Sequence, residues 1–307
     1  MTSPRLAGFA ALTIKGFCIG AANVIPGVSG GTIALILGVY KELIDAIASF
    51  NLRVLRLAVA LKVREALGAI SWPFLLPVGL GILLATVSLA QFLSMLLETY
   101  PVMIWSFFFG LILSSVLTVS KVVQVWGMLT FAATALGAVG AFFLFGLVPT
   151  ATPDALWFLF VSGLLAICAM ILPGISGAYI LVLLGKYHYA LEAINKRDLV
   201  ALFILAAGAA VGLLSFVRVI GWLLNKYHDV TMAVLIGLML GSLRRIWPWK
   251  ETLSGFSEGH ETEVAALQVN TLPGSFNGEV IGALLCMLLG VLLILAMNMA
   301  ARTRPSP

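Results

Sequence analysis

Charged residues are scarce in this sequence. Only 10% of the 307 residues are Asp, Glu, Lys or Arg, whereas 61% are hydrophobic. Soluble domains carry about 25% charged residues, and no soluble core could bury this much apolar surface. We therefore expect lipid to surround the chain. The net charge of +5 is ordinary for a membrane protein with basic loops and gives no sign of a nucleic-acid partner.

Cysteine and histidine are also rare, with three of each. The cysteines all lie in apolar segments and form no spaced pair, so we interpret them as small buried side chains. The histidines are scattered near segment ends or in a loop. These patterns predict no metal site, no cofactor and no Cys/His nucleophile.

Long apolar stretches, by contrast, recur along the whole chain. Stretches near or above the roughly 20 residues that span a bilayer lie at about 16–40, 74–97, 102–120, 125–148, 155–185, 199–217, 230–243 and 280–301. A membrane β-barrel would show short alternating strands instead. The sequence therefore predicts an all-α polytopic membrane protein.

The chain contains two copies of one unit. Residues 16–47 align without gaps with 163–194 at 12 of 32 positions, and residues 75–116 align with 202–243 at 10 of 42. The offset between aligned residues is 147 in the first block and 127 in the second. The first half therefore has 20 extra residues, which fall in a basic loop near 48–71. Internal repeats of this kind define the architecture of a chain.

The repeat divides the protein into two halves. We expect a first repeat over residues 1–150 and a second over 151–307, within one integral membrane domain. Each half has a motif segment, at about 16–40 and about 155–185, followed by three spans.

Each motif segment interrupts an apolar run with helix-breaking residues. The first reads NVIPGVSGGT and the second reads PGISGAY. Proline removes a backbone donor, and glycine accepts unusual dihedral angles. The residues expected at the two breaks, or tips, are Asn23, Pro26, Gly27, Pro173 and Gly174.

The position of the first break favours a hairpin over a broken span. Lys15 and Lys41 bracket an uncharged stretch centred on the motif, which leaves about 12 residues, or roughly 18 Å of helix, on each side. A re-entrant helical hairpin returns to the side from which it entered, so a repeat of one hairpin and three transmembrane helices crosses the membrane an odd number of times. The two repeats are then inverted. A broken span plus three gives parallel repeats. The Lys/Arg distribution does not separate the two, and we adopt the inverted arrangement.

The tips are suited to hold an anion. Inverted repeats with interrupted helices at the midplane are characteristic of secondary transporters. The first amides after each break have no intrahelical partner and carry the positive end of the helix dipole. We expect a phosphate site that contains Ser29, Gly30, Gly31, Thr32, Ser176, Gly177 and Tyr179. The alternative is that these residues only break helices and allow tight packing, which is how we interpret the isolated Gly110 and Gly237.

Arginines near or within the spans are further candidates. Arg218 lies inside an apolar segment, where ionisable residues suggest function, so we expect it to neutralise the phosphate. Snorkelling toward Lys226 is the alternative. Arg244 and Arg245 lie beside two tryptophans. We interpret them first as an interfacial aromatic and basic belt, and second as a site that captures a lipid headgroup.

At GAANVIPGVSGGTIALILGVYKELI and at PGISGAYILVLLGKY the sequence resembles a bacterial and archaeal family formerly of unknown function, the polyprenyl-phosphate (undecaprenyl-phosphate) translocases. The resemblance covers essentially the whole chain. It implies a flippase of the plasma (inner) membrane, multi-pass, that moves the lipid carrier of cell-envelope synthesis from the outer to the inner leaflet for recycling. The second copy departs from the first, because Ala178 and Tyr179 stand where Gly31 and Thr32 stand.

The expected partners are therefore the polyprenyl-phosphate lipid, the membrane and a coupling ion, either proton or sodium. Transport would expose the midplane site alternately to the two sides. One rival is an integral-membrane polyprenyl-diphosphate phosphatase, and another is a transporter of a small anion or ion. Hydrolysis needs a base or nucleophile at the tip, yet residues 16–40 and 155–185 contain no Asp, Glu, His, Lys or Arg. We therefore expect no enzymatic activity.

Overall fold

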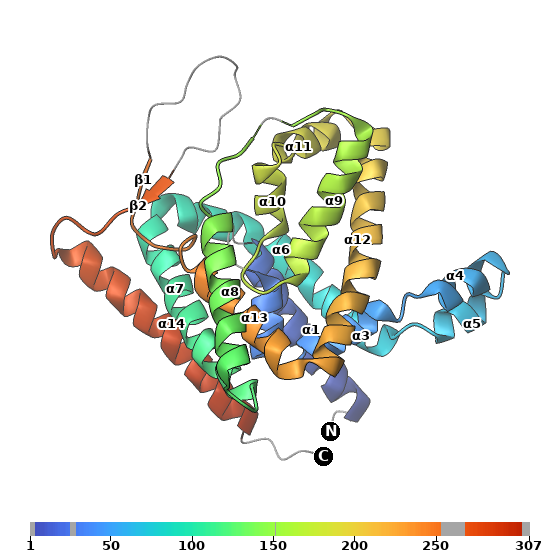
Figure 1. Cartoon of the computed structure of the whole chain (residues 1–307), viewed down its shortest axis with the longest axis horizontal. Coiled ribbons are helices and arrows are strands. Elements are labelled where there is room, and N and C mark those ends of the chain that lie inside the picture. Colours follow the sequence, from blue (N-terminus) through green and yellow to red (C-terminus); the bar gives the residue numbers. More distant parts are fainter. Residues whose placement is uncertain (1–3, 25–28, 151, 253–267, 303–307) are drawn as a thin grey trace.

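The protein is a bundle of helices with one short β-ribbon (Figure 1). The structure is a computed structural model that describes residues 4–24, 29–150, 152–252 and 268–302. The elements of the first half are α1 (Pro4–Val24), α2 (Gly30–Ile36), α3 (Tyr40–Ala48), α4 (Leu52–Val59), α5 (Val63–Gly68), α6 (Trp72–Thr99), α7 (Pro101–Val119), the 3-10 helix η1 (Ser120–Val122) and α8 (Met128–Leu144).

The second half repeats this order without the α4–α5 pair. Its elements are α9 (Leu156–Ile171), α10 (Gly177–Leu183), α11 (Tyr187–Asn195), α12 (Leu199–Lys226), α13 (His228–Ser242), β1 (Lys250–Thr252), β2 (Gln268–Asn270) and α14 (Gly278–Arg302). Helices α10 and α11 begin and end 147 residues after α2 and α3, and α12 begins and ends 127 residues after α6. The helix bounds therefore follow the offsets of the sequence alignment.

Four helices are long and apolar enough to cross a membrane within the described residues. They are α6, α7 with its 3-10 extension, α12 and α14, while α1, α8, α9 and α13 are apolar but shorter. Much of their apolar surface faces outward: Val87 of α6 is 77% exposed and Phe203 of α12 is 75% exposed. Such surface is suited to lipid, and the fold is that of a multi-pass helical membrane protein.

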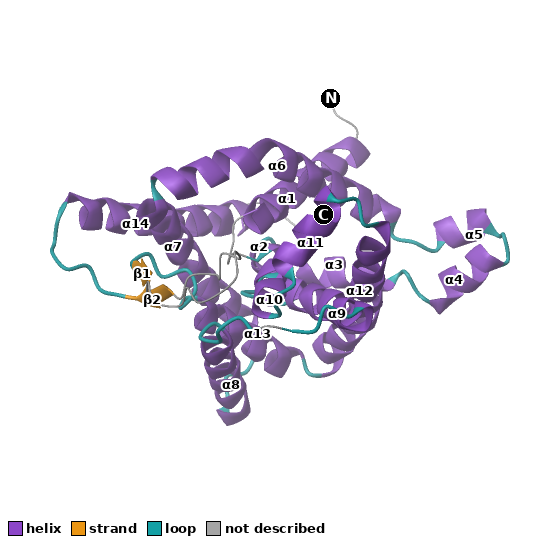
Figure 2. Cartoon of the chain, turned by 90° about the horizontal axis from the view of Figure 1, so that it is seen from above, coloured by secondary structure: helices purple, strands orange, loops and turns teal. Residues whose placement is uncertain are grey.

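The longer helices associate in four main pairs. Helix α1 packs on α6 and α9 on α12, each within one half, whereas α7 packs on α14 and α8 on α13, each across the halves. The third span of each half thus lies against the second span of the other half. This exchange interlocks the halves, and Figure 2 shows the resulting bundle from above.

Glycines bring these helix pairs into close contact. A Cβ on Gly110 would clash with the carbonyl of Met287 across the α7–α14 contact, and a Cβ on Gly237 would clash with the carbonyl of Thr134 across the α8–α13 contact. Small residues at such contacts are typical of membrane helices, because dispersion forces require close approach. The interpretation of Gly110 and Gly237 as packing residues therefore holds.

Two local features differ from the sequence prediction. Helix α1 begins at Pro4 instead of near residue 16, because Lys15 is a good helix former and does not end the helix. The first break consequently separates a long helix from the seven-residue α2. The sequence predicted an all-α protein, but Lys250 to Thr252 pair antiparallel with Gln268 to Asn270, so the described chain is not purely helical.

Candidate functional site

The first tip lies between α1 and α2. Pro26 and Gly27, two of the expected tip residues, lie outside the described residues. Asn23, in the last turn of α1, accepts a hydrogen bond on its side-chain oxygen from the amide of Gly30, at 2.8 Å. The Asn23 side chain therefore holds the beginning of α2 against the end of α1.

Ser29 is the N-cap of α2 and also contacts the other tip. Its Oγ accepts from the amide of Gly31 at 3.2 Å and donates to the carbonyl of Leu172 at 3.1 Å. The capping bond satisfies one amide that would otherwise lack a partner at the helix start. Ser29 is only 2% exposed.

The second tip runs from Leu172 to Ser176, between α9 and α10. Gly174 adopts a φ of +86°, a left-handed conformation that glycine accepts at little cost. Its amide donates to Oγ1 of Thr32, at 3.0 Å, and Thr32 is fully buried. The hydroxyl of Tyr40 donates to the carbonyl of Ile171, at 3.2 Å.

The two tips therefore meet at the centre of the protein, where Ser29 and Tyr40 donate hydrogen bonds to the second tip and Thr32 accepts one from it. In this conformation the hydroxyls of Ser29 and Thr32 bond to protein atoms. Gly31 and Gly177 each lie against a carbonyl of α9, which a Cβ would strike. These contacts favour the packing interpretation of the two glycines, and a direct phosphate contact at the tips stays a prediction.

Tyr179 connects the second tip to an adjoining cavity. It lies in the first turn of α10, after the N-cap Ser176. Its hydroxyl donates to the carbonyl of Leu144 at 3.2 Å, and its ring lies 5.0 Å from the Phe145 ring. On the same ring, the guanidinium carbon of Arg245 lies 5.2 Å from the centroid.

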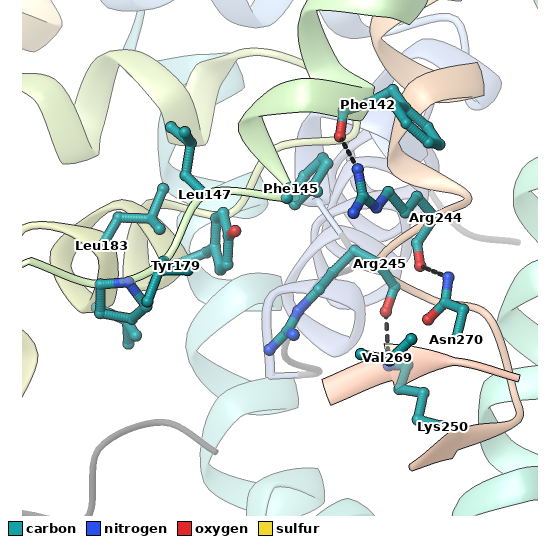
Figure 3. A pocket seen from close by; sticks show the side chains of 14 residues that line it. Phe142, Phe145, Leu147, Tyr179, Leu183, Arg244, Arg245, Lys250, Val269 and Asn270 are labelled. Atoms are coloured by element: carbon teal, nitrogen blue, oxygen red, sulfur yellow. Dashed lines mark hydrogen bonds between the residues drawn. The ribbon is translucent and has the colours of Figure 1, made fainter. Parts of the chain in front are cut away.

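This basic cavity has a volume of about 630 Å³ (Figure 3). Its walls come from the end of α8, the segment that follows it, α10, the segment after α13, and both strands. The lining residues are Phe142, Phe145, Gly146, Leu147, Val148, Pro149, Tyr179, Val182, Leu183, Arg244, Arg245, Lys250, Val269 and Asn270. Three of them are basic and none of these described lining residues is acidic, so the cavity is suited to an anion.

Each basic side chain of the cavity is held differently. Arg244 donates to the carbonyl of Phe142 at 2.8 Å and covers the ring of that residue at 4.2 Å. Lys250 donates to the carbonyl of Arg245 at 2.6 Å, and its ammonium lies 4.3 Å from the Trp105 ring centroid. The guanidinium of Arg245 makes no hydrogen bond to any described residue. Its donors are thus available to a bound group.

Burial and mutual repulsion of the cations in the cavity change their electrostatics. Burial, and then the charge of Arg245, lower the pKa of Lys250 to about 7. Burial also lowers the pKa of the Arg245 guanidinium. Both groups lie in the segment after α13, outside the spanning helices. A bound anion would offset the repulsion between these cations and favour their charged forms.

A buried lysine supports one wall of the cavity. Lys186 follows α10, is 2% exposed, forms an ion pair with Asp154 and donates to the carbonyl of Thr152 at 3.1 Å. The amide of Thr150 donates to the carbonyl of Leu183, a lining residue, at 3.2 Å. These bonds hold Thr150, Thr152 and Asp154 beside the end of α10, and the ion pair compensates the buried charge of Lys186.

Arg218 lies apart from these contacts. It is exposed on α12, where its guanidinium donates to the carbonyl of Leu214 and to the carbonyl of Phe50, the latter at 2.8 Å. It thus joins α12 to the segment after α3 instead of to a tip. Its expected role toward phosphate stays a prediction.

Sequence reasoning proposed Arg244 and Arg245 but missed Lys250 and the contact with Tyr179. Lys250 is the only Lys or Arg in the segment 248–279, which contains five Glu, and it directly follows Trp249. That isolation is a weak signal, because nothing in the sequence shows that the strand pairing brings Lys250 beside Arg245. Tyr179 was assigned to the tip by alignment, whereas its ring faces the cavity.

Comparison with known proteins identifies the family of the chain. The family model described as "VCA0040-like: Undecaprenyl phosphate translocase-like" matches residues 19–264. The polyprenyl-phosphate transporter of Vibrio cholerae serotype O1 is 40% identical over 291 residues, which cover 93% of this chain and 94% of that one. The polyprenyl-phosphate transporter of Staphylococcus aureus is 30% identical over 256 residues, 76% of this chain and 85% of that one. No solved structure matches. The chain therefore belongs to the undecaprenyl phosphate translocase-like family.

Proposed function

We propose that the protein transports polyprenyl phosphate and that the basic cavity binds the phosphate. The observation that carries this proposal is the convergence of Arg244, Arg245 and Lys250 on a cavity whose described lining includes no carboxylate. Arginine forks bind phosphate oxygens through two parallel hydrogen bonds, and lysine adds a point charge. The relatives named polyprenyl-phosphate transporters support the same substrate.

The rest of the cavity suits the first part of a prenyl chain. Phe142, Phe145, Leu147 and Leu183 supply an apolar wall beside the cations. Cavities of about 300–1,000 Å³ accommodate drug-sized ligands, so the headgroup and a few isoprene units fit into 630 Å³. A long polyprenyl tail does not fit, and it remains in the lipid around the bundle.

The two halves are, in this proposal, inverted repeats with re-entrant hairpins at α1–α2 and α9–α10. Support comes from the matched helix bounds and from the reciprocal pairs α7–α14 and α8–α13. Tyr179 touches the cavity, and the tip that precedes it is bonded to the other tip through Thr32. A shift between the tips would therefore move one wall of the cavity. This is the basis on which we propose alternating access.

Direction and coupling complete the proposal. The carrier lipid moves from the outer to the inner leaflet of the plasma (inner) membrane and is recycled in envelope synthesis. The coupling ion is a proton or sodium, and Lys250, which changes charge near neutral pH beside the proposed phosphate site, is a group through which a proton could act. The resemblance of the motifs to the translocase family supports the direction.

A polyprenyl-diphosphate phosphatase is the enzymatic alternative. Phosphate hydrolysis requires a general base or nucleophile near the substrate. The described lining of the cavity contains no Asp, Glu, His, Ser or Cys, and Lys250, which titrates near neutral pH, is held by the carbonyl of Arg245 and the ring of Trp105. This composition favours binding over chemistry, and we propose that the protein is not an enzyme.

A leaflet-resolved assay tests the proposal. Labelled polyprenyl phosphate is placed in proteoliposomes, and the fraction in each leaflet is followed with and without a proton or sodium gradient. We expect exchange between leaflets that empty liposomes lack, and no release of phosphate from polyprenyl diphosphate in parallel samples. Transport of inorganic phosphate without lipid exchange would favour the small-anion alternative, and phosphate release would favour the phosphatase.

A further inference from the structure

Helices α4 and α5 form a hairpin that projects from the bundle (Figures 1 and 2). The second half has no counterpart, because α11 there is followed directly by α12. The stem of the hairpin is closed: the amide of Ser71 donates to Oγ of Ser49 at 3.2 Å, and the rings of Phe50 and Trp72 lie edge to face at 6.1 Å. The insertion therefore leaves and re-enters the bundle at one point.

That point is the beginning of a spanning helix. Trp72 is the first residue of α6, one of the four helices long enough to cross a membrane. Tryptophan is enriched at the membrane–water interface, where its ring lies at the level of the headgroups. The stem thus places the α4–α5 hairpin beside the surface of the bilayer.

The surface of the hairpin combines apolar and basic side chains. Val54 and Ala66 are the buried positions among its described side chains. The exposed large apolar residues are Leu52, Val59, Leu61, Val63 and Leu67, with exposed fractions from 48% to 85%. The basic residues Arg53, Arg56, Lys62 and Arg64 are all exposed, whereas Glu65 is the one acidic residue in 52–68 and pairs with Lys62 at 3.3 Å.

The turn between the two helices presents the most exposed of these apolar side chains. Leu61 is 85% exposed and has a φ of +57°, in the left-handed region that leucine rarely adopts. Within the described chain nothing covers it, but the acyl boundary of a bilayer would.

We propose that the α4–α5 hairpin lies in the headgroup region of an anionic leaflet. Leu52, Val59 and Leu61 insert at the acyl boundary, and the four basic residues face lipid phosphates. Amphipathic helices with this composition bind membrane surfaces through buried apolar area and attraction to anionic lipids. A protein partner is disfavoured, because charged residues interrupt the apolar surface, whereas the centre of a protein interface is depleted of charge. The inference does not depend on the transported substrate.

Fluorescence quenching in the full-length protein tests this inference. The three cysteines are replaced by alanine, and a single Leu61→Cys is labelled with an environment-sensitive dye. Gln124→Cys, exposed between α7 and α8, is the solvent reference. Vesicles of phosphatidylcholine alone are compared with mixed phosphatidylcholine and phosphatidylglycerol vesicles. We expect nitroxide-labelled lipid to quench the Leu61 label, iodide to quench it less than the Gln124 label, and both differences to increase with phosphatidylglycerol.

Charge variants supply the matched control. Arg53→Gln with Arg56→Gln removes two cations from the hairpin. Each lost cation should weaken the binding of the hairpin to the anionic surface about fivefold. Lys196→Gln with Arg197→Gln removes two cations at the corresponding connection of the other half and should change nothing at Leu61. Equal access of iodide to both labels in both vesicle types would overturn the proposal. So would protection of Leu61 that depends on protein concentration, since that would indicate a second copy of the chain.

Discussion

The side chains of Ser29 and Thr32 connect two tips that are 142 or more residues apart in the chain. Each hydroxyl bonds to the backbone of the second tip, and both residues are almost fully buried. At the residue scale, the tips are therefore a structural joint in this conformation. The cationic groups that can hold a phosphate lie next to them, in the basic cavity.

Thr32→Val tests the joint. Valine has nearly the shape of threonine but leaves the buried amide of Gly174 without its acceptor. We expect a loss of about 1–3 kcal/mol in the free energy of unfolding, measured as a lower midpoint of denaturation in detergent. Thr86→Val is the matched control, because Thr86 is exposed and bonds only to the carbonyl of Ile82 in its own helix. Equal midpoints for both variants would contradict the joint.

Lys250 gives the cavity a pH dependence. Its pKa of about 7 means that the free protein loses this positive charge as the pH rises through neutrality. We expect the affinity of wild type for a short-chain polyprenyl phosphate, relative to that of Lys250→Arg, to fall about tenfold between pH 6 and pH 8. The ratio is used because the phosphate itself gains charge near pH 6, which affects both proteins. A constant ratio would show that Lys250 does not face the phosphate.

The lowered pKa of Lys250 also makes the stability of the folded protein depend on pH. A lysine whose pKa is lower in the folded protein binds fewer protons than in the unfolded chain between about pH 7 and its ordinary pKa. The free energy of unfolding should therefore rise with pH across this range, and the rise should be absent in Lys250→Met.

At the scale of elements, the α8–α13 contact depends on glycine. A Cβ on Gly137 would strike the carbonyl of Val234, whereas a Cβ on Gly140, one turn later on α8, would meet nothing within 4 Å. We expect Gly137→Ala to destabilise the protein by about 1–3 kcal/mol and Gly140→Ala to be neutral or to stabilise it by up to about 1 kcal/mol. Denaturation midpoints of the two variants should differ in this order, and the reverse order would exclude the close helix contact.

The sequence was sufficient for the elements that follow from local pattern. The breaks at proline and glycine within apolar runs predicted that new helices, α2 and α10, begin after them. The alignment of the two halves predicted the offset between α6 and α12. Family membership was also predicted from the two motifs, and the match over residues 19–264 confirms it. These features depend on residues close in the chain or on direct alignment.

Other parts of the candidate site depend on contacts that no local pattern contains. The pairing of β1 with β2 brings Lys250 beside Arg245, and three-residue strands leave no periodic signal. The exchange of α8 and α14 between halves was equally unpredictable, because an apolar lipid-facing helix carries little information about its partner. Arg218 was proposed from its depth in an apolar segment, yet its partner, Phe50, lies in the connection between α3 and α4, far away in the sequence.

At the scale of the whole molecule, the proposed inverted repeats would place corresponding connections on opposite sides of the membrane. Asn51 precedes α4 in the first half, and Lys196 follows α11 in the second. We expect a membrane-impermeant maleimide to label Asn51→Cys from one side and Lys196→Cys from the other, in a protein without native cysteines. Labelling of both from the same side would indicate parallel repeats.

The central claim is that the basic cavity, and Arg245 in particular, holds the phosphate of the lipid. Its most direct measurement is the affinity of purified protein for a short-chain polyprenyl phosphate in wild type, Arg245→Gln and Arg218→Gln. Because a hydrogen bond to a charged group contributes about 1.5–3 kcal/mol, we predict that Arg245→Gln weakens binding about 10- to 100-fold and that Arg218→Gln leaves it unchanged. Unchanged binding in Arg245→Gln, together with a loss in Arg218→Gln, would contradict the account.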